Sequence, residues 1–451
     1  MPIETREKPI RLLGWRKDFH RHIEGGLFLL QLVQIAQEFG VGFSNETVVT
    51  IQEQLDILRG KVADTTGKKE SKSIERFIRL LSTRWMRLII AKIMVRPDLD
   101  DLTAQKNVSD CVARFIEVAV EHGVKVERLS LLNLLYCPLS LAVDGDLEDP
   151  QRITGELLKE EVISYQALAS LKDHKKRGIT WKQYVEIASK KRAYLEEKYG
   201  IRLILTTSFR KDRDQRKLQD PAWIADAGDF LDIAFISEQT DCVDLCGPER
   251  KEYALEKFPD LINDFGQRTF YMSIHGGEVR FEEKEVGYAN LSVITQLPNV
   301  AFIPHGVRIT DRNKRAAQIN ANYEKHPASI LLNGRSNIET GLFKRLTRHR
   351  YIINKMKLGT NAHSAIVQVF RDAVPCSDDP AVYTDQPENT MRSEFHALLK
   401  ALHSLSEQLF DGERVSSLAI MKMISQSMQR QEEDFDQKLQ ERRQQALLQT
   451  E

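Results

Sequence analysis

Two histidines near the start of the chain have the spacing of a metal site. His20 and His22 are separated by one residue, at the end of a short run, 15–20, that we expect to be a strand. Residues i and i+2 of a strand point to the same side, so the two imidazoles converge. Imidazole nitrogens are ligands that zinc prefers. Because a lone H-x-H also arises by chance, a zinc site here needs further ligands.

A third histidine follows another expected strand, in the sequence His275-Gly-Gly-Glu278. Its imidazole could complete a set of nitrogen ligands. The two glycines permit a tight turn and leave space for a bound substrate. Glu278 would then lie near the metal without binding it, where a carboxylate can take a proton from water and pass it on.

Two further motifs carry groups that suit the same chemistry. His305-Gly306 ends the run NVAFIPHG, where a histidine could orient water or stabilise developing charge; a hydrogen-bonded structural histidine is the alternative. In Asp378-Asp379-Pro380 the neighbouring carboxylates point to different sides, so one could bind a cation while the other faces a substrate. A plain turn is the alternative for this motif, because Asp and Pro favour turns.

The elements that position these residues are expected to form a parallel α/β fold. Short β-branched or apolar runs alternate with amphipathic segments such as 181–199 and 249–267, which we expect to be helical. The expected strands are 15–20, 127–137, 201–208, 241–246, 269–275, 299–305, 328–333 and 371–377. About eight such repeats favour a closed (β/α)8 TIM barrel, in which sites lie at the carboxyl ends of the strands.

Polar residues capable of chemistry are expected at the ends of most of these runs. They are His20, Ser208, Asp244, His275, His305, Asn333 and Asp378. Such regular placement is typical of a barrel enzyme.

Two regions lie outside the barrel pattern. Residues 45–125 read as a helical insertion after the first strand, with an exposed loop at 66–73 and a helix-like segment at 74–95. Residues 391–451 read as a helical extension, so the barrel is expected to span 1–390. The extension could be a solvated helix packed on the barrel, or it could form a homo-oligomer.

Composition narrows the class of partner. The 451 residues carry 65 basic and 65 acidic side chains, so no net field draws the chain to nucleic acid or to a membrane surface, and a small molecule is the expected partner. Five cysteines are few and widely spaced, which fits a reducing compartment. Neither a signal peptide nor an apolar run long enough to span a bilayer is evident, so the sequence predicts a cytoplasmic protein.

Taken in order, these motifs resemble those of the adenosine and adenine deaminase family of the amidohydrolase superfamily, across residues 15–385. Three more segments are similar to family motifs. Asp18-Phe-His-Arg-His-Ile-Glu-Gly25 resembles the opening motif, Asp244-Leu-Cys-Gly-Pro-Glu249 resembles D-L-A-G-x-E, and Ser336-Asn337 resembles an S-N element.

The resemblance implies a zinc-dependent hydrolase that deaminates adenosine or a related aminopurine at C6 and releases ammonia. It implies one Zn²⁺ per chain with four ligands: His20, His22, His275 and Asp378. It also implies that Glu278 protonates ring N1 and that His305 orients the attacking hydroxide. Asp379 would contact N7, and the backbone N–H of Gly247 would meet N3.

Some positions depart from the family pattern. His-Gly-Gly-Glu replaces the usual H-A-G-E, which should be tolerated. Glu24 stands where an Asp contacts the sugar, so free adenine is an alternative to adenosine as the substrate. The long region 45–125 and the tail could reshape the pocket, so AMP and N6-modified forms also remain open. Every ligand and the catalytic acid are present. That favours an enzyme over the rival hypothesis, an inactive barrel with a structural, signalling or assembly role.

Overall fold

The computed structural model describes part of the chain, and all structural statements below concern that part. The described residues are 17–18, 23, 27–43, 48–49, 52–53, 56–57, 85–86, 88–121, 128–129, 132–134, 173–212, 214–277, 284–306, 318–319, 322, 328–333, 373–376 and 417–450. They divide into two compact units. The N-terminal unit holds the described residues from Ile23 to Cys246, and the C-terminal unit holds residues 17–18 and those from Gly247 onward.

In the N-terminal unit, three parallel strands are accompanied by long helices. The strands β3 (Leu132–Leu134), β4 (Leu205–Arg210) and β5 (Cys242–Cys246) lie in that order, with Leu132 opposite Leu205 and Thr206 opposite Cys242. A two-residue strand, β2 (Arg128–Leu129), precedes them. The helices are α2 (Leu29–Glu38), α5 (Asp101–Glu121), α7 (Trp181–Tyr199), α8 (Gln215–Leu218) and α9 (Pro221–Ile236).

Local sequence explains where two of these helices begin and end. Thr180 accepts a hydrogen bond from the backbone N–H of Gln183, whose side chain accepts one from the N–H of Thr180, so α7 starts with a capping box. Gly200 ends α7 at a φ of 61°, a conformation that glycine adopts without strain. Asp220 caps α9, and Pro221 occupies its first turn, where its missing N–H costs nothing.

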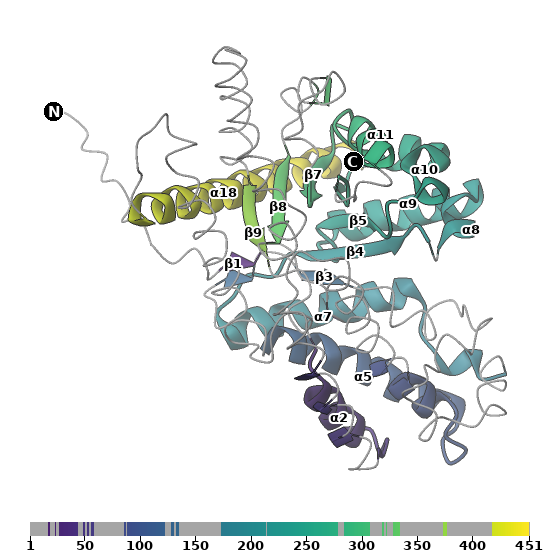
Figure 1. Ribbon diagram of the computed structural model, residues 1–451. Coiled ribbons are helices and arrows are strands. Elements are labelled where there is room, and N and C mark those ends of the chain that lie inside the picture. The colour runs from purple at the N-terminus through teal and green to yellow at the C-terminus, as the bar shows by residue number, and fades with distance from the viewer. Residues whose placement is uncertain are drawn as a thin grey trace. The chain divides into compact units, whose positions relative to one another are not determined.

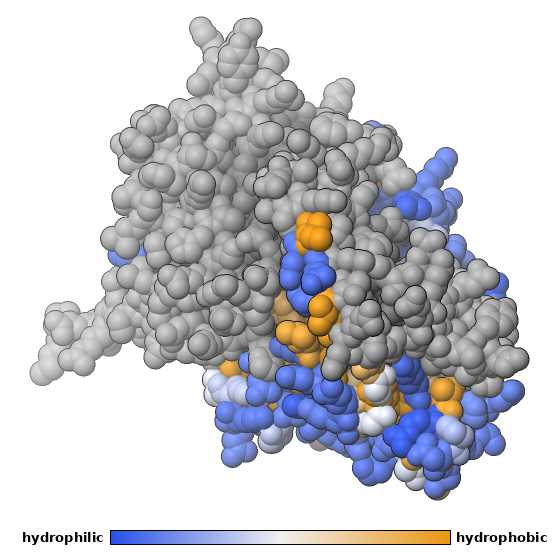
Figure 2. Space-filling model, turned by 60° about the horizontal axis from the view of Figure 1, so that its bottom comes forward, coloured by the Kyte–Doolittle hydropathy of each residue, from blue (hydrophilic) through white to orange (hydrophobic). Residues whose placement is uncertain are grey.

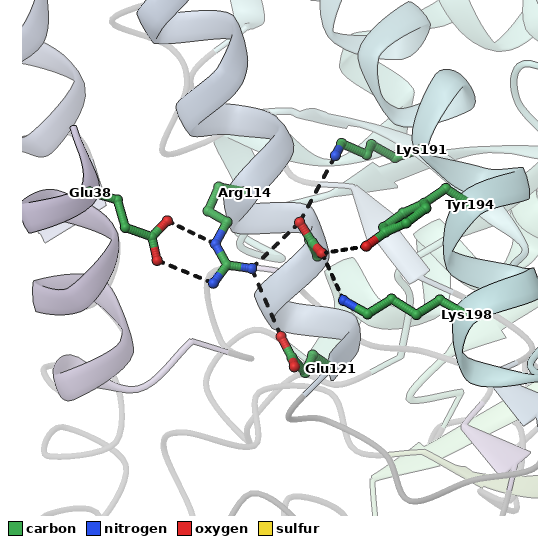
Figure 3. A network of polar contacts seen from close by, with 7 residues as sticks. Glu38, Arg114, Glu121, Lys191, Tyr194 and Lys198 are labelled. Carbon is green, nitrogen blue, oxygen red and sulfur yellow. Dashed lines mark hydrogen bonds and ion pairs between the residues drawn. The ribbon is translucent and has the colours of Figure 1, made fainter.

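A polar network ties α2, α5 and α7 together (Figure 3). Arg114 of α5 forms two hydrogen bonds with Glu38 of α2 and an ion pair with Glu117. Glu117 in turn pairs with Lys198 of α7 at 3.0 Å. Burial opposes ionisation of Glu117, but the hydrogen bond from Lys198 and the nearby cationic side chains outweigh it and lower the pKa of this carboxyl.

Arg177 holds the segment that precedes α5 in the N-terminal unit. It lies in the 3₁₀ turn η5 (Lys175–Arg177), and its buried guanidinium donates to the backbone carbonyls of Met94, Arg96 and Leu99. It also pairs with Asp101 at 2.8 Å. The arginine therefore satisfies carbonyl groups where the helical residues 88–94 give way to the turn before α5.

The C-terminal unit is built on four parallel strands. They are β6 (Tyr271–Ile274), β7 (Val300–Pro304), β8 (Ser329–Asn333) and β9 (Ala373–Cys376), in that order. The two-residue strand β1 (Lys17–Asp18) contacts β9. Between β5 and β6 the chain forms η6 (Lys251–Tyr253), η7 (Leu255–Lys257) and α10 (Pro259–Phe265), and α11 (Lys284–Ile294) precedes β7.

The long C-terminal helix α18 (Ser417–Thr450) is part of the core of this unit. It contacts β9 (Figure 1). Its Phe435 ring packs on Tyr271 of β6 and Phe302 of β7, with ring centroids 5.8 and 4.8 Å away. Arg442 lies over the Tyr271 ring and donates to the carbonyl of Arg268. One face of α18 thus packs against strands of the same chain, while self-association through its other face stays a prediction.

Each expected strand overlaps an observed strand, and the expected helix 181–199 has the observed bounds of α7. The expected run 127–137 is split into β2 and β3. The expected helix 249–267 is confirmed only in its second part, α10. The first part forms two 3₁₀ turns, because Pro259 interrupts helical hydrogen bonding and starts a new helix. The α/β class with parallel strands is confirmed for the described residues, whereas closure into a barrel stays a prediction.

Other predictions fall partly or wholly on residues that the structure does not describe. Helical residues at 85–86 and 88–94, together with α5, lie within the expected insertion at 45–125. Within the expected extension at 391–451, the structure describes the helix α18. The loop 66–73 and residues 391–416 lie outside the described residues.

Among the described residues that are visible on the face drawn in Figure 2, hydrophilic ones predominate and hydrophobic ones form small groups. Isolated exposed apolar side chains such as Leu30 and Leu102 are ordinary on a protein surface. Within the described part, no helix has both the length and the apolar character that crossing a bilayer requires.

Candidate functional site

Three of the nine predicted site residues lie among the described residues, and all three are in the C-terminal unit. They are Gly247, His275 and His305. The other six predicted residues lie outside the described part: His20, His22, Glu24, Glu278, Asp378 and Asp379. The described part of the site therefore consists of Gly247, the two histidines and the residues around them.

His275 and His305 lie side by side at the carboxyl ends of neighbouring parallel strands. His275 directly follows β6 and His305 directly follows β7. Their ring centroids are 5.5 Å apart, with an angle of 56° between the rings. Both side chains are buried, with His275 8% and His305 6% exposed. The expected placement of both histidines at strand ends is confirmed, whereas their roles stay predictions.

Backbone hydrogen bonds continue past the strands and hold the two histidines in register. The N–H of Gly306 donates to the carbonyl of Gly276 at 2.9 Å, and the N–H of Gly276 donates to the carbonyl of Pro304 at 3.3 Å. Gly276 and His305 thereby form a parallel bridge beyond the named strands. The backbone that carries the two imidazoles is thus held by the sheet itself rather than by a flexible loop.

The backbone at these strand ends adopts a conformation that is costly for most residues. His305 has a φ of 70°, and only one other described non-glycine residue, Glu238, has a positive φ. A side chain in the left-handed region costs about 1–3 kcal/mol, and such strain concentrates at functional sites. Gly277, at a φ of 77°, needs the freedom of glycine to turn the chain after His275. Strain at His305 favours a functional role for it over a purely structural one.

Glu249 supports the turn after His275. Its side chain is buried, and Oε1 accepts hydrogen bonds from the backbone N–H of Gly277 at 2.8 Å and from Nδ2 of Asn290 at 3.0 Å. Asn290, on α11, is completely buried, and its Oδ1 accepts a hydrogen bond from the N–H of Leu255 at 2.9 Å. Sequence reasoning reached Glu249 only as the last residue of a motif and missed Asn290, which gives no signal beyond a polar residue within an expected helix.

Gly276 lies directly against α11. A Cβ atom placed on it would come within 2.5 Å of Cδ1 of Ile294 and 3.6 Å of Cδ2 of Leu291. The glycine that replaces alanine in the motif is therefore matched by an isoleucine that fills the space of the missing methyl group.

Two residues expected at strand ends lie inside strands instead, so those predictions are wrong. Ser208 and Asp244 are opposite each other within β4 and β5, because the pairing extends to Arg210 and Cys246. Asp244 is completely buried and accepts a hydrogen bond from Ser208 at 3.3 Å. Burial, followed by the nearby negative charge of Asp244, raises the pKa of the Cys242 thiol well above its usual range. Asn333 is the last residue of β8, as expected.

The remaining predicted residue, Gly247, follows Cys246 directly and has a φ of 109°. Its contact with a substrate stays a prediction.

The donor chemistry of the site fits zinc as far as it is described. Two buried imidazoles meet at a strand end, and imidazole nitrogen is a zinc ligand. Among the described residues no group of three His, Cys, Asp or Glu side chains could hold a metal ion. A zinc site here would therefore draw its remaining ligands from predicted residues outside the described part.

Comparisons with known proteins add little. No family model matches the chain, and no curated protein matches it. Similar solved structures include an adenine deaminase from Arthrobacter aurescens, with 13% identity, a TM-score of 0.48, and 92% of this chain and 98% of that one covered. They also include an amidohydrolase from Burkholderia ambifaria with bound Zn, with 13% identity, a TM-score of 0.49, and 97% and 96% covered. At such scores and identities, these likenesses carry no argument about activity or metal.

Proposed function

We propose that this protein is a zinc-dependent hydrolytic deaminase that converts adenosine or a related aminopurine to the 6-oxopurine and releases ammonia. The observation that carries the proposal is the pair His275 and His305, buried side by side at the carboxyl ends of β6 and β7. Parallel α/β enzymes place catalytic residues at this end of their strands.

The proposal includes a closed barrel spanning 1–390, with a helical insertion at 45–125 and an extension at 391–451. Closure requires the first and last strands to be neighbours. The contact between β1 and β9 supports it.

His20, His22, His275 and Asp378 would hold one Zn²⁺, which when bound lowers the pKa of a water molecule toward ~7. The described geometry fits this assignment at His275, because its buried side chain lies at a strand end whose backbone is held by the bridge between Gly276 and His305. His305 would be left to donate to, or accept from, the oxygen that adds to C6.

The residues beyond the metal ligands would move protons and hold the ring. Glu278 would deliver a proton to ring N1 as water adds to C6, and general acid catalysis of this kind is worth about 10²–10⁴ in rate. Asp379 would hydrogen-bond N7, and the backbone N–H of Gly247 would donate to N3. Glu24 would lie toward the sugar, where its length bears on whether nucleosides or free bases are accepted.

The test is ammonia release by purified protein of measured zinc content, against adenosine, deoxyadenosine, adenine, AMP and N6-substituted forms. We expect turnover of at least one compound, and its near-complete loss in Glu278→Gln with zinc retained. Glu256→Gln is the matched control, because Glu256 is exposed in η7. Zinc-loaded protein that releases ammonia from none of these compounds would favour the rival, an inactive barrel with a structural or signalling role.

A further inference from the structure

The carboxylate of Glu249 is built into the C-terminal unit as the centre of a hydrogen-bonded chain. Both of its hydrogen bonds described above end on the same atom, Oε1. The Asn290 amide is fixed in turn, because its Oδ1 accepts from the N–H of Leu255, which leaves Nδ2 to donate to Glu249. We call Leu255, Asn290, Glu249 and Gly277 the Glu249 brace.

The brace ends on the peptide that separates two predicted functional residues. Gly277 lies between His275 and Glu278 in the sequence and has a φ of 77°, which glycine adopts without strain. Because glycine has many other conformations open to it, a hydrogen bond is needed to hold the chain in this one. The N–H of Gly277 donates to a buried carboxylate, and hydrogen bonds to charged groups are stronger than neutral ones. The direction in which the chain leaves His275 is therefore set by Glu249.

We propose that Glu249 is a positioning residue: through the N–H of Gly277 it fixes the backbone that carries Glu278 and so aligns the predicted proton donor. This inference rests on the deaminase function proposed above. Glu249 acts here as a hydrogen-bond acceptor, whereas a residue that transferred protons or bound metal would need its charge.

Two variants separate the hydrogen-bond acceptor of Glu249 from its charge. Glu249→Gln keeps an oxygen that can accept both hydrogen bonds and loses the charge. Glu249→Ala loses both hydrogen bonds. Asn290→Ala removes one of the two donors and leaves the Gly277 contact, so it should fall between them. Glu256→Ala is the control, since Glu256 is an exposed glutamate close by in the chain.

Two readouts are compared in the full-length, zinc-loaded protein. The first is hydrogen–deuterium exchange of peptides covering 271–283, which does not need turnover. The second is kcat and KM for ammonia release from the substrate with the highest activity. In Glu249→Ala we expect exchange in these peptides to rise about ten- to a hundredfold, which corresponds to the loss of a hydrogen bond to a charged group. We expect kcat to fall with KM little changed and zinc retained. Glu249→Gln should recover part of both losses, because its neutral oxygen accepts the same hydrogen bonds more weakly.

Equal losses of kcat in Glu249→Gln and Glu249→Ala would overturn the proposal, because charge rather than geometry would then matter. Unchanged exchange and kcat in Glu249→Ala would also overturn it. If Glu249→Ala does not fold, Glu249→Gln and Asn290→Ala decide between the two roles. Wild-type protein that binds zinc but turns over no substrate refutes the deaminase function and the catalytic part of this inference, while exchange at Gly277 still reports the brace.

Discussion

The contact between Gly276 and Ile294 predicts a specific coupling between a site residue and the helix behind it. A methyl group added at Gly276 would lie 2.5 Å from Cδ1 of Ile294. Carbon atoms pack at about 3.5–4.0 Å, so an overlap of more than ~1 Å has to be relieved. Ile294 is completely buried and has no solvent to move into. Overpacking of this kind costs about 1–3 kcal/mol, which is the loss expected for Gly276→Ala.

The compensating change is Ile294→Val, which removes the clashing Cδ1 atom. Alone it should cost about 0.5–1.5 kcal/mol, because it leaves a small cavity. In the double variant the added methyl occupies part of that cavity. The two costs should therefore not add: the double variant should lose at least ~1 kcal/mol less stability than the sum of the two single losses.

The assay is urea unfolding of the four proteins followed by circular dichroism, with the midpoints compared at one shared slope. Gly42→Ala is the control, because a Cβ atom there meets nothing within 4 Å. Additivity within about 0.5 kcal/mol would refute the reasoning. A Gly276→Ala variant as stable as Gly42→Ala would refute it as well.

Three further predictions concern stability. Arg177→Met should lower the free energy of unfolding by about 3 kcal/mol, because it leaves three carbonyl groups without their donor, whereas the exposed control Lys176→Met should stay near wild type; equal urea midpoints would contradict this. Phe435→Ala should cost about 3–5 kcal/mol in chemical denaturation, against little change for Leu448→Ala, since Phe435 is 7% and Leu448 74% exposed. The pKa of Glu117 is lowered in the folded protein, so its ionised form stabilises the fold above the unfolded-state pKa of ~4.3, and this stabilisation is lost as the pH falls through the folded pKa. In Glu117→Gln the free energy of unfolding should therefore fall less steeply on acidification than in the wild type. A fall as steep as in the control Glu186→Gln would argue against this.

Local signals allowed much of the fold to be predicted. The helix α7 was predicted with its observed bounds from the helical pattern of residues 181–199, and the structure shows that Thr180, Gln183 and Gly200 mark its ends. The run 299–305 predicted β7 for a similar reason, since a short apolar run ends at a histidine and a glycine. Where pairing decides, prediction was less accurate: Ser208 was placed at a strand end, but β4 continues to Arg210, whose partner is Cys246.

The candidate site was predictable in its reactive residues and not in their support. His275 and His305 stand out because histidines that follow apolar runs suggest chemistry at the ends of parallel strands. The partner of Glu249 could not be found this way, because Asn290 is 41 residues further along the chain and nothing local pairs them. The strain at His305 is also invisible in the sequence, since histidine gives no sign of a positive φ.

The most direct test of the central claim is the zinc content of purified wild-type protein and of His275→Ala, measured by mass spectrometry after exhaustive dialysis. His174→Ala, which changes a partly exposed histidine outside the site, is the control. We expect about one zinc per chain in the wild type and in the control, and a loss of most of it in folded His275→Ala. Wild-type protein without zinc, or folded His275→Ala that retains it fully, would contradict the account.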